Sequence, residues 1–430
     1  MNQDTVGRSL PRTEGPDKVT GHSMYVDDLH RAGMLHGAFL LAPYAHARIL
    51  RIDTAAALAL PGVRCVLTGE DFPRRYGAFV KDEEALALHM VRYYGEPVAV
   101  VAADDLATAQ QARDLIEVDY EELPALMTPD EALAADAALV HEHFDAYPRR
   151  FTGTLARNVC AHTTMSEGDV EQGFAMAEVI VEATYETQPQ VHCYLEPCGA
   201  MAELDDNGRV VVWSACQAVH RVQATTAEVL GLPMSQIRAV ATRVGGAFGG
   251  KSDVTVQPVA AMLALRTRRP VKLVLARNDD FLMMRTRHPS RVWMRTGALR
   301  DGTLVAREAR VVMDGGAYAE DSSAVLGFSV FMTRGPYRIP HVRGEGMVVY
   351  THRLRAAGFR GYGNPQMCFA GESQMDELAD KLGMDPLELR LKNAMVAGDV
   401  AFGGERLGAS GLVECLEKLR EAMRWDERRA

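Results

Sequence analysis

The strongest chemical signal in the sequence is a glycine-rich stretch that ends in Lys251 and Ser252. Four glycines fall within positions 245–250, directly after the strand-like run 237–242. Glycine lets the backbone approach a ligand closely, and a strand, a glycine-rich turn and a helix start together present N–H groups to an anion or an oxo group. The spacing Gly-x-x-x-x-Gly-Lys-Ser also satisfies the phosphate-binding P-loop pattern. The stretch therefore has two interpretations, a phosphate cradle or one wall of an oxo-binding site.

The surrounding sequence weighs against a nucleotide site. A P-loop needs an acidic residue at the end of a second strand, whereas Asp279 and Asp280 lie beyond the end of the predicted strand 271–275 and match this requirement poorly. A P-loop also usually opens its domain, and this stretch lies past the middle of the chain. A P-loop protein that binds nucleoside triphosphates is kept as the remote alternative.

Two other segments place polar and aromatic side chains beside predicted turns. Gln217 follows the predicted strand 210–214, and an amide can donate a hydrogen bond to an oxo group without adding charge. Residues 357–366 contain Arg360 and Tyr362 between glycines. A guanidinium offers donors in a fixed geometry, and an aromatic face can hold a flat ring in plane. Taken alone, Gln217 is also compatible with an exposed polar position and Tyr362 with a core aromatic, so the residue types leave the role of these segments open.

Composition and residue spacing argue against several kinds of partner and binding site. The net charge of −10 argues against nucleic acid as the main partner. The seven cysteines form no C-x-x-C pair, and His192, Cys193 and Glu196 match no zinc-binding spacing, so we expect turn and core residues there. No apolar run reaches the roughly 18 residues of a transmembrane helix, and residues 1–12 lack a signal-peptide core. We expect a cytoplasmic protein with no membrane partner.

The hydrophobic pattern predicts a mixed α/β (α+β) chain. Residues 1–130 form a first unit, residues 131–165 a connector and residues 166–430 a larger region. In the first unit we predict strands at 34–41, 47–52, 63–67, 98–103 and 116–120 and helices at 54–60 and 105–116. Four arginines later in the chain form either a basic patch or, as we prefer, part of a solvated strand or turn; they are Arg285, Arg287, Arg291 and Arg295.

Several segments resemble the xanthine dehydrogenase/aldehyde oxidase family of molybdenum hydroxylases. Residues 16–21, 44–49 and 94–99 resemble its N-terminal hammerhead-like domain, and the resemblance covers residues 8–425 in all. The glycine stretch resembles the family's G-G-x-F-G-G-K loop, and residues 357–366 resemble its F-R-G-F/Y-G-x-P-Q loop. The resemblance implies a hammerhead-like domain followed by the first part of a molybdopterin-binding domain.

The resemblance also assigns roles to individual residues. The Gln217 amide would reach the metal-bound oxo group, Phe248 and Gly249 would lie against the molybdenum centre with N–H groups toward its oxygen, and Arg360 would approach the cofactor. These three positions, Gln217, Phe248 and Arg360, would lie near molybdenum without ligating it. The implied cofactor-binding residues are Gln217, Gly246, Ala247, Phe248, Gly249, Arg360 and Gly361. The implied substrate-binding residues are Tyr362, Ser252 and Phe328.

The family's general-base Glu, in a G-x-G-E context, has no counterpart here. We therefore expect no catalytic residue in this chain and a Glu on a partner. The layout resembles nicotinate dehydrogenases, whose molybdenum-binding unit is divided between two polypeptides. That resemblance implies a molybdenum–molybdopterin cofactor, expected in its cytosine dinucleotide form, and three partners: a second molybdopterin subunit, a [2Fe-2S] subunit and an FAD subunit.

Two positions bear on the substrate. Xanthine-type enzymes carry a Glu where this chain has Ser252, and an Arg near the position of Phe328. Carbon monoxide dehydrogenases carry a Cys in the arginine loop, and residues 353–366 contain none. We expect hydroxylation of a nicotinate-like N-heteroaromatic with oxygen from water. A xanthine or aldehyde dehydrogenase subunit is the alternative, and a scaffold without cofactor is a third hypothesis.

Overall fold

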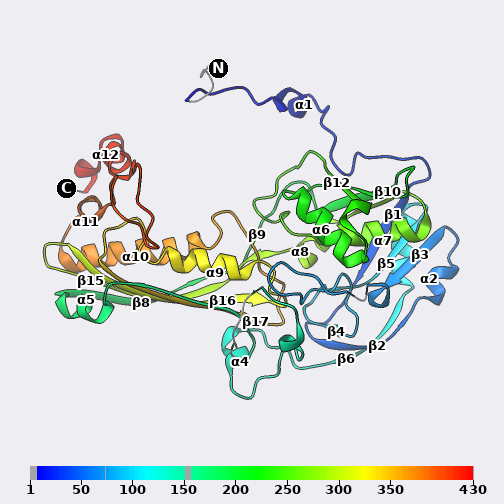
Figure 1. The fold of residues 1–430 in the computed structure, drawn as a ribbon, viewed down its shortest axis with the longest axis horizontal. Helices are drawn as coiled ribbons and strands as arrows, with labels where there is room; N and C mark the ends of the chain where they lie inside the picture. The colour runs from blue at the N-terminus through cyan, green and yellow to red at the C-terminus, as the bar shows by residue number, and fades with distance from the viewer. Residues whose placement is uncertain (1–6, 73, 151–154, 156, 430) are drawn as a thin grey trace.

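A seven-stranded sheet and a long five-stranded sheet occupy opposite ends of the molecule (Figure 1). The computed structural model describes residues 7–72, 74–150, 155 and 157–429. The first sheet has the order β12 (Ile237–Ala241), β11 (Val210–Ser214), β10 (Gly199–Leu204), β13 (Val271–Val274), β1 (Leu35–Leu41), β5 (Pro97–Ala103) and β3 (Val63–Thr68). The second has the order β7 (Val159–Glu167), β17 (His341–Tyr350), β16 (Leu304–Gly316), β15 (Ser290–Ala298) and β8 (Val179–Thr187).

The seven-stranded sheet joins distant parts of the sequence. Strand β1 pairs in parallel with β13, with Leu35 opposite Val271, and pairs antiparallel with β5. The unit predicted at residues 1–130 and the larger region after it thus share one hydrogen-bonded sheet. This arrangement makes the sheet a common frame for both parts of the chain.

Strand β5 is buried on both faces, which explains its unbroken run of small apolar residues. Val100 and Ala102 contribute to the core cluster that includes α7 (Gln257–Thr267). The alternate residue Val101 packs instead with Ala112 of α3 (Leu106–Asp114). Because side chains of a strand alternate between faces, helices on both sides are needed to cover this strand.

Helices also cover the five-stranded sheet. Helix α10 (Asn364–Leu382) contacts β8 and β15, and α9 (Ser322–Phe331) contacts β7 and β17. The remaining helices are α1 (Gly15–Val19), α2 (Ala55–Ala59), α4 (Pro129–Leu133), α5 (Val170–Met176), α6 (Val219–Leu230), α8 (Arg277–Met283), α11 (Pro386–Asn393), α12 (Leu412–Ala422) and α13 (Trp425–Arg429). Short sheets pair β4 (Met90–Val91) and β6 (Glu117–Glu122) with β2 (Ala47–Asp53), and β14 (Thr286–Arg287) with β9 (Gln190–Val191).

The predicted strands and helices of the first unit are present with small changes at their ends. The Asp105 side chain caps α3 by accepting a hydrogen bond from the Thr108 N–H at 2.8 Å. Thr54 occupies the cap position of α2, but its side chain makes no capping bond. Strand β7 begins inside the range predicted as a connector. In the described part of the chain, no helix has the length and apolarity needed to span a membrane.

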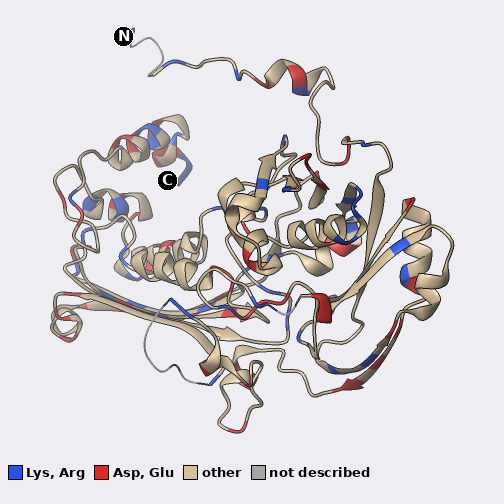
Figure 2. Ribbon diagram, turned by 45° about the vertical axis from the view of Figure 1, so that its right-hand side comes forward, with Lys and Arg blue, Asp and Glu red and all other residues tan. Residues whose placement is uncertain are grey.

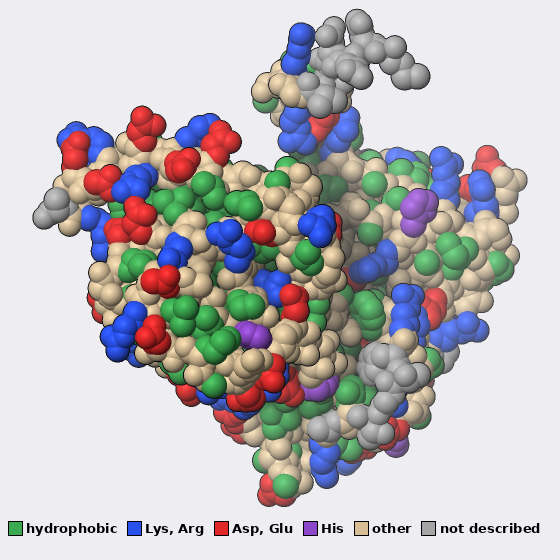
Figure 3. All heavy atoms as spheres, turned by 60° about the vertical axis from the view of Figure 1, so that its left-hand side comes forward, with side chains coloured by type: hydrophobic (Ala, Val, Ile, Leu, Met, Phe, Trp, Pro, Cys, Tyr) green, Lys and Arg blue, Asp and Glu red, His purple; other side chains and the backbone are tan. Residues whose placement is uncertain are grey.

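Charged groups of both signs are interspersed along the ribbon (Figure 2). The space-filling view likewise shows Lys and Arg beside Asp and Glu, with hydrophobic side chains between them (Figure 3). This mixture fits a protein whose surface carries no extended basic stripe on the face shown.

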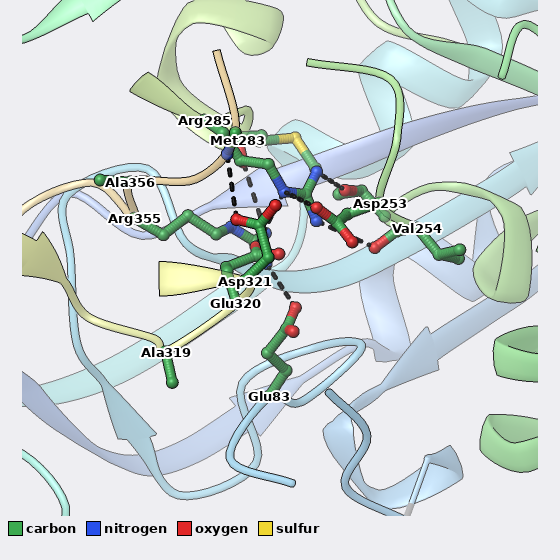
Figure 4. A network of polar contacts seen from close by, with 12 residues as sticks. Glu83, Asp253, Val254, Met283, Arg285, Ala319, Glu320, Asp321, Arg355 and Ala356 are labelled. Atoms are coloured by element: carbon green, nitrogen blue, oxygen red, sulfur yellow. Dashed lines mark hydrogen bonds and ion pairs between the residues drawn. The ribbon is translucent and has the colours of Figure 1, made fainter. Parts of the chain in front are cut away.

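Two arginines form a buried ionic network at the junction of the sheets (Figure 4). The Arg285 guanidinium lies 2.9 Å from the Glu320 carboxylate and donates to Thr255 Oγ1 at 2.8 Å. The Arg355 guanidinium bridges Glu83 at 3.0 Å and Glu320 at 3.1 Å. The prediction of a solvated position was wrong for Arg285, because acids far away in the sequence compensate its charge.

A second buried acid makes the stability depend on pH. One oxygen of Asp82 accepts hydrogen bonds from the Tyr350 hydroxyl at 2.6 Å and the Ala319 N–H at 2.8 Å. Among the described residues, its other oxygen has no hydrogen-bond partner. Burial raises the pKa of Asp82 to about 6. Because this value exceeds the unfolded one, Asp82 makes the folded protein less stable as the pH rises from about 4 through 6.

We predict that Asp82→Asn becomes more stable than the wild type as the pH rises. Asparagine keeps an acceptor for both hydrogen bonds and cannot ionise, so the difference in unfolding free energy should grow by up to about 3 kcal/mol between pH 4 and pH 7. Urea denaturation of both proteins at each pH measures the effect. Parallel pH dependences would show that Asp82 ionises as freely in the folded chain as in the unfolded one.

Candidate functional site

The glycine stretch forms a loop that follows β12 and precedes α7 in the chain, and it adopts a conformation that few residues tolerate. The φ angles are +94° at Gly246, +53° at Phe248 and +105° at Gly249. Ala247 between them is buried, whereas Phe248 is 46% exposed. Left-handed φ values are readily available to glycine and costly for other residues. The loop therefore holds a strained backbone and an exposed aromatic ring side by side.

The glycine loop touches the loop at residues 357–363 through its backbone. The Arg360 N–H donates to the Phe248 carbonyl at 2.9 Å. A Cβ atom at Gly249 would lie 2.4 Å from the Gly358 carbonyl oxygen, so no side chain fits there. The structure thus brings together the two segments that the sequence singled out separately.

Gln217 is bound to the glycine loop at both its backbone and its side chain. Its N–H donates to the Lys251 carbonyl at 2.9 Å, and its side-chain Oε1 accepts from the Gly249 N–H at 3.0 Å. The Gly249 N–H, which the resemblance assigns to a metal-bound oxygen, donates to Gln217 in this structure. The exposed Gln217 amide NH₂ remains a donor that faces outward from the loop.

The Lys251 side chain is buried and forms an ion pair inside the protein. Its ammonium lies 2.9 Å from Glu196 Oε2 and 4.6 Å from the centre of the Tyr194 ring, and its side chain is fully buried. The same Glu196 oxygen accepts a hydrogen bond from the Gly245 N–H at 2.7 Å. Helix α7 begins only at Gln257, so the loop does not run directly into a helix. These contacts exclude the P-loop arrangement, because the lysine cannot reach a phosphate.

His192 connects the two loops as a structural residue. Its Nε2 lies 3.0 Å from the Gly358 carbonyl oxygen, its Nδ1 lies 3.2 Å from that of Arg285, and its ring stacks on Phe359 at 4.3 Å. Burial lowers the pKa of His192. In the described ranges of the chain, no three His, Cys, Asp or Glu side chains gather as a metal site.

Arg360 presents its side chain outward from a fixed backbone. The Arg287 guanidinium donates to the Arg360 carbonyl at 2.8 Å and lies 4.2 Å above the Phe359 ring. Arg287 is itself buried, which corrects the prediction of a solvated position. The exposed Arg360 guanidinium forms no ion pair with an acid of the described chain, so its donors are available to an anionic group.

The three predicted substrate residues lie around this pair of loops. The rings of Phe328 and Tyr362 meet edge to face with centroids 5.6 Å apart, and Phe328 is 52% exposed. The Tyr362 hydroxyl donates to Asp321 at 2.7 Å. Ser252 is half-buried, and its N–H donates to the Gly249 carbonyl at 3.1 Å. Asp321 was missed by the sequence reasoning, although it closely follows the Asp-Gly-Gly-Ala-Tyr motif at 314–318.

Together these residues fit an anionic, oxygen-rich cofactor. Gln217 and Arg360 offer exposed donors, and Gly246, Gly249 and Gly361 let the backbone pack closely where a Cβ would meet neighbouring protein atoms. Hydrogen-bond donors of this kind suit a group that carries phosphate and oxo oxygens. The two loops therefore form a polar surface suited to an anionic cofactor, beside the ring pair of Phe328 and Tyr362.

Comparison with known proteins agrees with a site of this kind. Residues 20–124 match the a/b hammerhead domain of aldehyde oxidase and xanthine dehydrogenase, and residues 151–394 match the molybdopterin cofactor-binding domain. The chain belongs to the xanthine dehydrogenase/aldehyde oxidase family of molybdopterin-binding proteins.

Three relatives illustrate the range of this family. A probable xanthine dehydrogenase subunit from Bacillus subtilis is 39% identical over 95% of this chain, which spans 54% of that protein. The large molybdopterin subunit of Eubacterium barkeri nicotinate dehydrogenase is 35% identical, and the match covers 97% of this chain and 96% of that subunit. Quinoline 2-oxidoreductase from Pseudomonas putida 86 superposes with a TM-score of 0.90 at 29% identity, covering 98% of this chain and 55% of its own. This chain thus spans about half the length of several relatives.

We predict that Gly249→Ala disrupts the site. A methyl group there would strain a backbone at φ +105° and strike the Gly358 carbonyl, so the two loops would separate. We expect a lower melting temperature and a loss of most bound molybdenum, measured by calorimetry and metal analysis. Gly404→Ala is the matched control, because Gly404 has a φ of +91° with no atom near its Cβ position. Equal effects of both substitutions would contradict a specific contact between the loops.

Proposed function

We propose that this chain is the large molybdenum-cofactor-binding subunit of a divided molybdenum hydroxylase. The observation that carries the proposal is the backbone contact between the glycine loop and the Arg360 loop beside the Phe328–Tyr362 pair. This contact places outward-facing polar donors next to an exposed aromatic wall. The proposed substrate is an N-heteroaromatic of the nicotinate type, hydroxylated with oxygen from water.

In this proposal the bound cofactor supplies the activated water and accepts the electrons. The residues of this chain bind the cofactor and orient the substrate. Gln217 would donate a neutral hydrogen bond to an oxygen of the cofactor, and Arg360 would add charge-assisted donors. Phe328 and Tyr362 would hold a flat ring at the rim of the site, where aromatic faces favour planar ligands.

The remaining parts of the reaction are assigned to other polypeptides. A second molybdopterin subunit would contribute the general-base Glu, and iron–sulfur and FAD subunits would carry the electrons away. Support comes from the Eubacterium barkeri subunit, which this chain matches over nearly its full length. The cytosine dinucleotide form of the cofactor is part of the same proposal.

A xanthine or aldehyde dehydrogenase subunit is the second candidate. It is favoured by relatives that carry those names, including the Bacillus subtilis protein. Two residues of the proposed substrate site argue against purine oxidation. Ser252 and Phe328 offer no charged side chain to a purine. We therefore place the heteroaromatic substrate first.

We predict that the complex purified with this chain contains about one molybdenum per copy and oxidises nicotinate faster than hypoxanthine. The chain produced alone should be inactive. Metal analysis and parallel assays with nicotinate, hypoxanthine and benzaldehyde measure these outcomes. A complex that lacks molybdenum, or one that turns over hypoxanthine best, would overturn the corresponding part of the proposal.

We also predict that Phe328→Ala weakens binding of a flat substrate. Loss of the half-exposed ring removes one aromatic wall, which should raise KM about tenfold with a smaller change in kcat. Phe281→Ala is the control, since Phe281 is a partly exposed phenylalanine of α8 outside this wall. An unchanged KM in the Phe328 variant would remove that residue from the substrate site.

A further inference from the structure

Asp321 stands at the helix-capping position of α9 but does not cap the helix. Asp at this position ordinarily accepts a hydrogen bond from the first turn. Here the side chain makes no capping bond. Both carboxylate oxygens instead turn to the Arg360 loop: Oδ1 accepts from the Gly358 N–H at 3.0 Å and Oδ2 accepts from the Tyr362 hydroxyl at 2.7 Å. The acid stabilises the loop and leaves its own helix uncapped.

These two hydrogen bonds connect the proposed substrate side of the site, formed by Phe328 and Tyr362, with the proposed cofactor side, where Gly358 packs against Gly249. Tyr362 meets Phe328 edge to face, while Gly358 packs against Gly249 and accepts at its carbonyl from His192. A single carboxylate thus holds both neighbours at once. Tyr362 also has a φ of +48°, a conformation that needs such support in a residue other than glycine.

The Asp321 side chain is buried among charged neighbours. It is 4% exposed and lies beside the buried network of Arg285, Glu320 and Asp253 (Figure 4). The adjacent residue, Glu320, is held by the two buried arginines. A buried carboxylate with fixed neighbours can transmit their position to the loop, whereas an exposed one would follow the loop's motion.

We propose that Asp321 is a positioning residue that lowers the KM for a planar substrate by holding the Tyr362 ring edge to face against Phe328. This inference rests on the proposed function and names the anchor of its substrate side. With the ring fixed, this side presents a defined face to a planar heteroaromatic. Without this anchor, the Tyr362 ring is no longer held against Phe328, and the KM for a planar heteroaromatic rises.

The test uses the assembled enzyme and three variants. Tyr362→Phe removes one of the two bonds and Asp321→Ala removes both. Asp321→Asn retains both in altered form, because its oxygen accepts from Gly358 and its NH₂ donates to Tyr362. Tyr337→Phe is the matched control, since Tyr337 makes a 2.8 Å bond to Glu372 away from these loops.

We expect Tyr362→Phe and Asp321→Ala each to raise KM for nicotinate about tenfold and to change kcat less. The double variant should be no worse than the more affected single one, because both changes remove the same anchor. Asp321→Asn should raise KM less than Asp321→Ala. In hydrogen exchange, Tyr362→Phe should speed exchange across residues 357–363, and Tyr337→Phe should not.

The outcomes separate this inference from the proposed function. A wild-type complex without molybdenum or without nicotinate turnover would overturn the function, whereas faster exchange in Tyr362→Phe would still support the anchor. An active wild type whose single variants act additively on KM would overturn the positioning role of Asp321. Unchanged exchange in Tyr362→Phe would overturn it as well, and that variant remains informative if Asp321→Ala does not fold.

Discussion

The rest of the structure depends on one constraint: the positive charges of two buried arginines must be balanced by nearby acids. Arg285 and Arg355 are both almost fully buried, and Glu320 is in ion-pair contact with each of them. A charge removed from water is tolerated only where partners replace its hydration, so each of these side chains fixes the place of the others. Glu83 brings the N-terminal part of the chain into the same network, and Thr255 brings the segment after the glycine loop.

Other buried charges explain how two strained loops can stay in contact. Loops with left-handed residues at Phe248 and Tyr362 store strain that the surrounding structure must outweigh. Here the Lys251–Glu196 ion pair holds one loop from within, and Arg287 holds the other by donating to the Arg360 carbonyl. Buried charges thus fix the geometry of both loops, and the exposed side chains of the loops remain available to ligands.

Local patterns in the sequence were enough to predict most elements and both loops. Strand β5 and helix α3 follow from apolar spacing and a capping Asp, which act within a few residues. The burial of Arg285 was not predictable in this way, because its partners lie far along the chain. The same holds for the hydrogen bond from the Gly249 N–H to Gln217 and for the bonds of Asp321 to the Arg360 loop, because these partners are more than thirty residues apart in the sequence.

The parallel pairing of β1 with β13 has a consequence for how the chain folds during synthesis. Strand β1 leaves the ribosome early, but its neighbour Val271 follows only after the whole intervening region, including the glycine loop, has been made. Contacts of such long range form slowly, since the intervening chain must close first. The edge of β1 that pairs with β13 therefore remains without its partner while the intervening chain is made. During this interval the nascent protein is most open to misassembly.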